Sequence, residues 1–142
     1  MTGQLVLRFL PFVLYGIITD LGVIIKVNGE ELKSTVSLKL NKDFRRLYNR
    51  GKHFAGGYIV VYAMKNRLGT NRIGLTAGKA VGNAVKRNRA KRLIRESYRF
   101  LEHDIKQGYD FVIVARGRCV GKSLQQISKD MEYAMRKLEL MI

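Results

Sequence analysis

The sequence has little of what a disulfide-stabilised, metal-binding or membrane-spanning protein requires. Its 142 residues include one cysteine, Cys119, and two histidines, which excludes a disulfide framework and a CxxC-type zinc site. The apolar N-terminal region holds an uncharged run of only 11 residues, 9–19, whereas a membrane-spanning helix needs about 20. We therefore expect a protein of the reducing cytoplasm with no membrane partner.

Acidic residues are also scarce. The chain has 11 of them against 27 lysines and arginines, which gives a net charge of +16 and a pI near 10.3. The hydrophobic and charged fractions, 46% and 27%, are those of an ordinary globular protein, and the length fits one domain. Because so large an excess of one sign opposes compaction by self-repulsion, it indicates a polyanionic partner, and nucleic acid is the first candidate.

The charge is not spread evenly along the chain. Residues 1–35 contain three basic and three acidic side chains, whereas residues 36–142 contain 24 basic and 8 acidic ones. We expect an RNA-binding domain over 36–142 and an apolar extension over 1–35. The extension lacks the cleavage site of a signal peptide, so a dispensable leader or a misassigned start is favoured over a membrane-surface anchor.

Periodicity outlines the elements of the domain. A short helix is predicted over 41–50 with Asn41 as its N-cap, followed by strands over 57–64, 72–78 and 110–116. The third strand is almost continuously apolar, which predicts burial on both faces. Ser123 is predicted to cap a final helix, whose apolar stripe is Leu124, Ile127, Met131, Met135 and Leu138.

The most informative segment is Lys79–Arg99, with eight basic residues and one acid, Glu96. On a helical wheel the apolar side comprises Ala90, Leu93, Ile94, Ser97 and Leu101, and the opposite arc comprises Lys91, Arg92, Arg95 and Arg99. The residues before Ala90 break this register. Either the helix is contacted on different sides at its two ends, or Gly82 and Asn83 form a turn and Arg87, Asn88 and Arg89 project from the first helical turns.

Aromatic residues favour an unpaired RNA strand as one ligand. Phe44 and Tyr48 on the first helix, with Tyr58 and Tyr62 on the first strand, can form a platform on which bases stack. The alternative for Phe44 is packing in the core. The open face of the second strand, Gly74, Thr76 and Gly78, leaves room for another group to approach closely.

These segments together resemble the protein subunit of bacterial ribonuclease P. The resemblance is carried by KAVGNAVKRNRAKRLIRESYR, with SLKLNKDFRRLYNRGK, YIVVYAMKN and RIGLTAGK before it and YDFVIVAR after it, and it covers about residues 37–140. It implies a single-domain α+β fold, an α-β-β-β-α-β-α sandwich similar to a ribosomal-protein domain. It also implies a short strand near His53 and a left-handed β-α-β crossover before the basic helix, against the usual right-handed rule.

The resemblance further implies a function. In that family a large RNA, using magnesium, hydrolyses a phosphodiester of precursor tRNA to release the 5′ leader, and the protein assists. The residues expected at the catalytic RNA are Arg87, Asn88, Arg89, Arg92 and Lys79. Those expected at the single-stranded leader, in a cleft between the first helix and the sheet, are Phe44, Tyr48 and Tyr62, with Lys91 and Arg95 at its edge.

The distribution of acids agrees with an assisting role, because a protein nuclease would need positioned carboxylates for metal ions or a histidine pair. The acids after residue 36 are scattered, and His53 and His103 lie in no recognisable motif. We therefore expect no catalytic residue and no metal ligand on the protein. The main alternative is an RNA-binding module without turnover, such as a ribosomal-RNA-binding protein. A DNA-binding protein with the basic helix in a major groove is a second alternative, and it predicts a preference for duplexes.

Overall fold

The structure, a computed structural model, describes residues 34–142, which form one α+β unit. Of the predicted N-terminal extension, residues 1–33 lie outside the described part, so the expectation of a leader, a misassigned start or an anchor stays a prediction. Within the described part, no helix combines the length and apolarity that crossing a bilayer demands.

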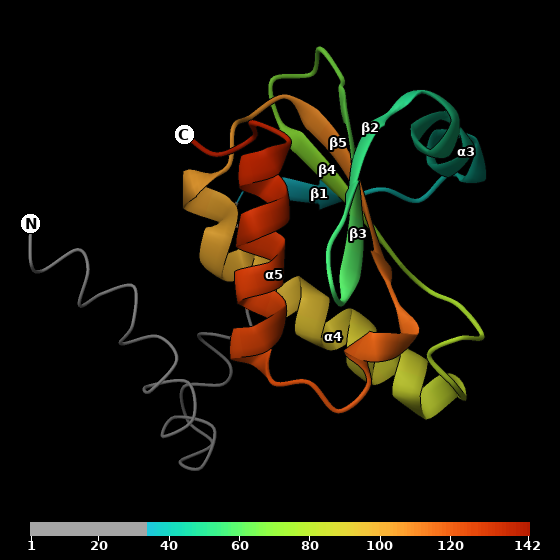
Figure 1. Ribbon diagram of the computed structural model, residues 1–142. Coiled ribbons are helices and arrows are strands. Elements are labelled where there is room, and N and C mark those ends of the chain that lie inside the picture. The colour runs from blue at the N-terminus through green and yellow to red at the C-terminus, as the bar shows by residue number, and fades with distance from the viewer. Residues whose placement is uncertain (1–33) are drawn as a thin grey trace, which may run out of the picture. The chain divides into compact units, whose positions relative to one another are not determined.

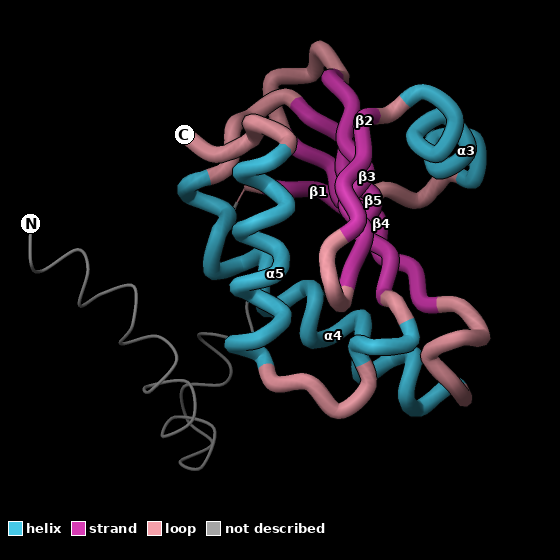
Figure 2. Tube along the Cα trace, viewed as in Figure 1, coloured by secondary structure: helices cyan, strands magenta, loops and turns pink. Residues whose placement is uncertain are grey.

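A five-stranded mixed sheet forms the centre of the unit, in the order β1-β4-β5-β3-β2 (Figure 2). The parallel part comprises β1 (Thr35–Ser37), β4 (Asn71–Ala77) and β5 (Tyr109–Ala115). The antiparallel part adds β3 (Ile59–Lys65) beside β5 and β2 (Lys52–Ala55) at the edge. The short strand near His53 that the resemblance implied is β2.

Helices cover the two faces of the sheet unequally (Figure 1). One face carries the short helix α3 (Asn41–Arg50), and the other carries α4 (Ala84–Leu101) and α5 (Leu124–Lys137). The helix α4 joins the parallel neighbours β4 and β5, so it lies in the β-α-β unit whose crossover the resemblance implied to be left-handed. Because α3 is only 10 residues long, it leaves part of its face uncovered.

The alternation of side chains along the strands explains these two layers. In β3, Ile59, Val61 and Ala63 are buried, whereas Tyr62 and Met64 on the opposite face are half-buried against the layer that contains α3. In β5, Phe111, Val112 and Ile113 are all fully buried, which confirms the prediction of a strand buried on both faces. The alternating pattern of β3 is typical of a strand with one well-covered face.

The predicted helix over 41–50 is confirmed in its bounds, but Asn41 is not the N-cap. Leu40 occupies that position and provides no side-chain cap, while Asn41 already lies inside the helix. The Leu40 carbonyl accepts from the amides of Asp43 and Phe44, at 3.0 and 3.3 Å. Asp43 also places a carboxylate in the first turn, where the helix dipole favours negative charge.

The caps of the two longer helices agree with the sequence. Asn83 caps α4, its side chain accepting from the Lys86 amide at 3.0 Å, and Gly82 before it adopts φ +128°. The turn at Gly82 and Asn83 is therefore the alternative that holds. The helix is continuous from that turn, and the residues that broke the register lie before it or in its first turns. Ser123 caps α5 in a capping box with Gln126.

The buried faces of these helices agree with the predicted stripes, with one addition. Ile127, Met131 and Met135 of α5 are fully buried, and Leu124 and Leu138 at the ends of the stripe are half-buried. In α4 the buried residues are Ala90, Ile94, Ser97, Tyr98 and Leu101, while Leu93 is half-buried. Tyr98, which is absent from the predicted stripe, is also fully buried, and its ring lies 6.0 Å from that of Phe111.

The strand β1 was not predicted, because three residues carry too little pattern to show a period. A polar network fixes it to the end of α4. Glu102 accepts from the Ser34 amide at 2.8 Å and from the Thr35 hydroxyl at 3.0 Å, and the Thr35 and Tyr98 hydroxyls lie 3.0 Å apart. Burial raises the pKa of Tyr98 to about 12, so its hydroxyl keeps its proton for these bonds. Ser34 and Thr35 are therefore joined by hydrogen bonds to the C-terminal end of α4.

A buried carboxylate ties α3 to the sheet. Asp110 on β5 is 1% exposed and receives Nε and Nη2 of Arg72 at 2.8 and 2.7 Å. Arg46 of α3 and Asn66 of the β3–β4 loop add bonds of 3.1 and 2.9 Å. Burial opposes ionisation, but the hydrogen bonds from Arg72 and Asn66 and the nearby positive charges lower the pKa of Asp110 below its ordinary value.

Replacing Asp110 by Asn should lower the free energy of unfolding at neutral pH by about 1–3 kcal/mol, because two guanidinium groups lose their shared carboxylate. Since the folded pKa is lowered, this stabilisation is present above the ordinary Asp pKa of about 3.9 and is lost as the pH falls through the folded value. Urea unfolding across the acid range should therefore show a weaker loss of stability in Asp110→Asn than in the wild type. Glu132→Gln, which removes the i,i+4 pair with Arg136 on α5, is the control and should change stability by less than about 1 kcal/mol.

Candidate nucleic-acid interface

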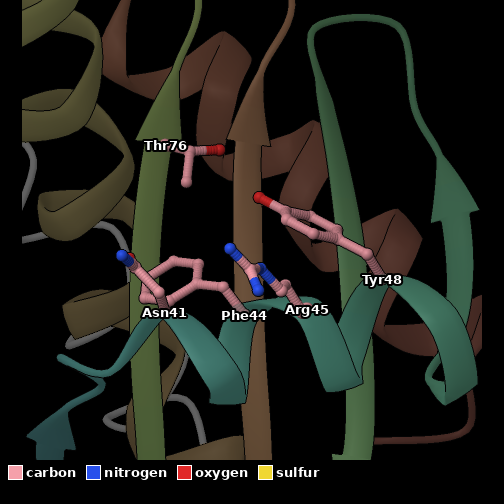
Figure 3. A pocket seen from close by; sticks show the side chains of 5 residues that line it. All are labelled: Asn41, Phe44, Arg45, Tyr48 and Thr76. Atoms are coloured by element: carbon pink, nitrogen blue, oxygen red, sulfur yellow. The ribbon is translucent and has the colours of Figure 1, made fainter.

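A pocket of about 360 Å³ lies between α3 and the sheet. Figure 3 shows side chains from α3 lying over the strands, with Thr76 contributed by β4. The residues that line it are Asn41, Phe44, Arg45, Tyr48 and Thr76. The pocket thus combines two aromatic rings with hydrogen-bonding groups and one guanidinium, which suits an unpaired nucleotide.

Three rings continue from this pocket across the sheet. The rings of Tyr48 and Tyr62 meet edge to face, with centroids 5.0 Å apart, and Tyr62 lies nearly parallel to His53 at 5.4 Å. Tyr48 and His53 are exposed and Tyr62 is half-buried. The structure therefore brings together Phe44, Tyr48 and Tyr62, the three aromatic residues expected at the leader.

Gly74 explains how α3 comes so close to the sheet. A Cβ atom at Gly74 would lie 2.4 Å from Cζ and 2.6 Å from Cε1 of Phe44. The room predicted beside Gly74 is therefore filled by the protein's own Phe44 ring, and an external group finds space at Thr76 instead. Phe44 serves both roles considered for it, since it packs against the core of Leu38, Leu47 and Val112 and also lines the pocket.

Tyr58 lies apart from these rings in its contacts. It precedes β3, and its ring lies under the Lys122 ammonium at 5.2 Å, in a cation–π contact. Its amide donates to Asp130 of α5 at 2.8 Å, so this residue helps to join the β2–β3 turn to α5.

The second candidate surface surrounds the start of α4. Lys79 is exposed in the loop between β4 and α4, and the buried Val81 anchors that loop. Arg87 is half-buried, with its Nε donating to the Gly82 carbonyl at 2.8 Å. Asn88, Arg89 and Arg92 are exposed. The five residues expected at the catalytic RNA thus occupy one loop and the first half of one helix.

The acids of the described residues do not neutralise the positive charge of this surface. Within residues 34–142, the only ion pair made by α4 joins Arg99 to Glu96, at 3.3 Å near the C-terminal end of the helix. The exposed basic residues toward the N-terminus are thus free to bind phosphate groups, and the N-terminal end of the helix dipole adds to their attraction.

Lys91 and Arg95 are separated from the aromatic residues with which they were grouped. Both lie on α4, Lys91 half-buried and Arg95 exposed, and α4 packs on the face of the sheet opposite α3 (Figure 1). Their place at the edge of the leader-binding cleft stays a prediction. The structure shows an aromatic pocket on one side of the sheet and a basic helix on the other.

The carboxylates that join α3 to the sheet do not fit a metal ion. Asp43 and Asp110 are both occupied by arginines, with Asp43 3.4 Å from Arg46 and 3.8 Å from Arg72. Across the described residues, no three His, Cys, Asp or Glu side chains are grouped so as to hold a metal ion.

Comparisons with known proteins identify the family of this chain. The sequence model of the family Ribonuclease P matches residues 32–139. This chain belongs to the ribonuclease P protein family. The ribonuclease P protein component of Alkaliphilus oremlandii is 38% identical over 109 residues, which cover 77% of this chain and 96% of that protein. The component from Clostridium botulinum is 44% identical over 101 residues, covering 70% and 91%.

Solved ribonuclease P proteins share the fold. The Staphylococcus aureus protein matches with a TM-score of 0.68 and 31% identity, over 75% of this chain and 97% of that one. The Thermotoga maritima protein matches with a TM-score of 0.63 and 27% identity, over 68% and 92%. The predicted α+β sandwich is therefore confirmed as the fold of a ribonuclease P protein.

Part of the pocket of this ribonuclease P protein was not predicted from the sequence. Arg45 and Asn41 line it beside Phe44, and Thr76 faces them from β4. Thr76 was recognised as a member of an open strand face, but only the position of α3 shows what it faces. His53 had no motif to identify it, and its contact with Tyr62 arises from strand pairing.

Gly74→Ala should displace the Phe44 ring and destabilise the protein by about 1–3 kcal/mol, because the new methyl group would overlap that ring. Gly78→Ala in the same segment is the control. Nothing lies within 4 Å of a Cβ at Gly78, so this variant should unfold within about 0.5 kcal/mol of the wild type. Equal stability of the two variants in urea titrations would show that α3 does not depend on this contact.

Proposed function

We propose that this chain is the protein subunit of a ribonuclease P ribonucleoprotein that removes the 5′ leader from precursor tRNA in the cytoplasm. The observation that carries the proposal is the pairing of an aromatic pocket with a basic helix on a domain that belongs to the ribonuclease P family. An RNA-binding module without turnover is not favoured, because the family match covers almost the whole described domain.

The RNA subunit, with magnesium, is proposed to perform the hydrolysis. On the protein, Asp43 and Asp110 are engaged by Arg46 and Arg72, so they are poorly placed to bind a metal ion or to accept a proton. The protein instead contributes binding energy and orientation. Such positioning of substrate relative to a catalytic centre can account for a large part of a rate enhancement.

The basic surface at the start of α4 is proposed to bind the catalytic RNA. Its residues are Lys79, Arg87, Asn88, Arg89 and Arg92. Arginine guanidinium groups bind phosphate oxygens in a bidentate manner, and the Asn88 amide can both donate to and accept from a base or a ribose. The bond from Arg87 to Gly82 holds one of these guanidinium groups close to the helix start, which limits the entropy lost on binding.

The aromatic pocket is proposed to bind the single-stranded leader, through Phe44, Tyr48 and Tyr62. Aromatic rings accept any unpaired base on their faces, and Arg45 at the same pocket can bind a phosphate. Lys91 and Arg95 are proposed to bind the RNA as it passes from the pocket toward α4.

Cleavage of precursor tRNA by the cognate RNA at low magnesium tests the assignment directly. Adding this chain should raise the rate, because a basic protein compensates for the missing divalent charge at the RNA interface. Absence of any stimulation would contradict the assignment to ribonuclease P.

Two sets of variants should separate the surfaces. Arg89→Ala combined with Arg92→Ala should weaken binding to the catalytic RNA and reduce the slope of log affinity against log salt by about 0.7–0.9 per lost phosphate contact. Arg136→Ala on α5, an exposed arginine paired with Glu132, is the matched control and should leave that slope unchanged. Tyr62→Ala should lower precursor affinity while catalytic-RNA affinity stays the same. The same defect in the α4 double variant and in Tyr62→Ala would contradict the division into two surfaces.

A further inference from the structure

His53 lies at the open end of a row of residues that crosses four strands in register. His53 of β2 pairs with Tyr62 of β3. Across the next two strands, Tyr62 pairs with Val112 of β5, and Val112 pairs with Gly74 of β4. The Phe44 side chain of α3 covers the Gly74 end of this row, and Val112 is fully buried. Coverage falls along the row, because Tyr62 is half-buried and His53 is exposed.

The His53 ring is held in a defined orientation although it is exposed. It stacks on Tyr62 with an interplanar angle of 29° and a centroid distance of 5.4 Å, and Tyr48 supports Tyr62 edge-on from α3 at 5.0 Å. A ring that already stacks on its neighbour keeps few rotamers, so stacking of a base on the exposed side costs little further entropy. Tyr62 therefore connects the pocket to a ring that is open to solvent.

The charges around this ring suit RNA. Between Phe44 and Lys65 the chain contains no acidic residue, whereas Arg45, Arg50 and Lys52 are basic and exposed. A phosphate backbone that leaves the pocket along Tyr62 would therefore pass only basic side chains of this segment.

We propose that His53 is a further substrate-binding residue, on which an unpaired base of the leader stacks beyond the bases held by Phe44, Tyr48 and Tyr62. The proposal rests on the proposed function, since it extends the same leader-binding site toward the edge strand β2. It assigns His53 a contact with a nucleotide farther from the cleavage site than those in the pocket. His53 contributes to affinity and takes no part in the chemistry.

A series of precursor tRNAs whose leaders lengthen one nucleotide at a time tests this contact in the assembled holoenzyme. His53→Thr removes the ring and introduces a residue that is common in strands, whereas His53→Phe keeps an aromatic ring. His53→Thr should bind short-leader precursors as the wild type does. Once the leader is long enough to reach β2, the affinity of His53→Thr for the precursor should be about fivefold or more below that of the wild type. A loss of this size corresponds to the lower end of the free energy of base stacking on an aromatic ring. His53→Phe should restore most of that loss.

Other outcomes would overturn the proposal. An equal loss at every leader length would make His53 a support for Tyr62 rather than a contact to RNA. Unchanged affinity at every length, or failure of His53→Phe to restore binding when it assembles normally with the catalytic RNA, would show that no base stacks there. Tyr48→Ala in the same series tests the proposed function separately. Because Tyr48 lines the pocket, this variant should bind precursors more weakly than the wild type already at short leader lengths.

Discussion

The Asp110 carboxylate anchors the helix α3 to the sheet, and the pocket depends on that helix. One buried acid on the central strand β5 binds Arg72 of the neighbouring strand and Arg46 of the helix. Its neighbour Asp43 shares both arginines at longer distances. In a protein with so few acids, two of them are used to hold α3 on the sheet, and Gly74 allows the Phe44 ring to come close. The pocket lies where this short helix leaves the face of the sheet uncovered.

The two candidate RNA-binding surfaces lie on opposite faces of the sheet. Residues that line the pocket lie with α3 on one face, and the basic start of α4 belongs to the layer on the other face. Two RNA segments can therefore approach without competing for the same side chains. The exposed arginines near the start of α4 lack acidic neighbours in the described chain, so a salt-sensitive partner is expected to provide the compensating charge.

Local sequence patterns were sufficient to predict the longer elements, because their apolar periods and caps are local properties. Ser123 and Asn83 do begin their helices where side-chain chemistry favours a start. Contacts between distant segments were not predictable in this way. The stacking of His53 on Tyr62 requires the register of β2 with β3, and the ring that fills the space at Gly74 comes from 30 residues earlier in the chain. The strand β1 is too short to show a period, and it is fixed by Tyr98 and Glu102 instead.

Site-directed cross-linking tests most directly whether two RNAs bind two separate surfaces. Cys119, the only cysteine, is 1% exposed and burial raises its thiol pKa, so it should not compete with an introduced thiol. A cross-linker on Arg89→Cys should capture the catalytic RNA, and one on Arg45→Cys should capture the leader of the precursor. Capture of the same RNA from both positions in the assembled holoenzyme would contradict the account.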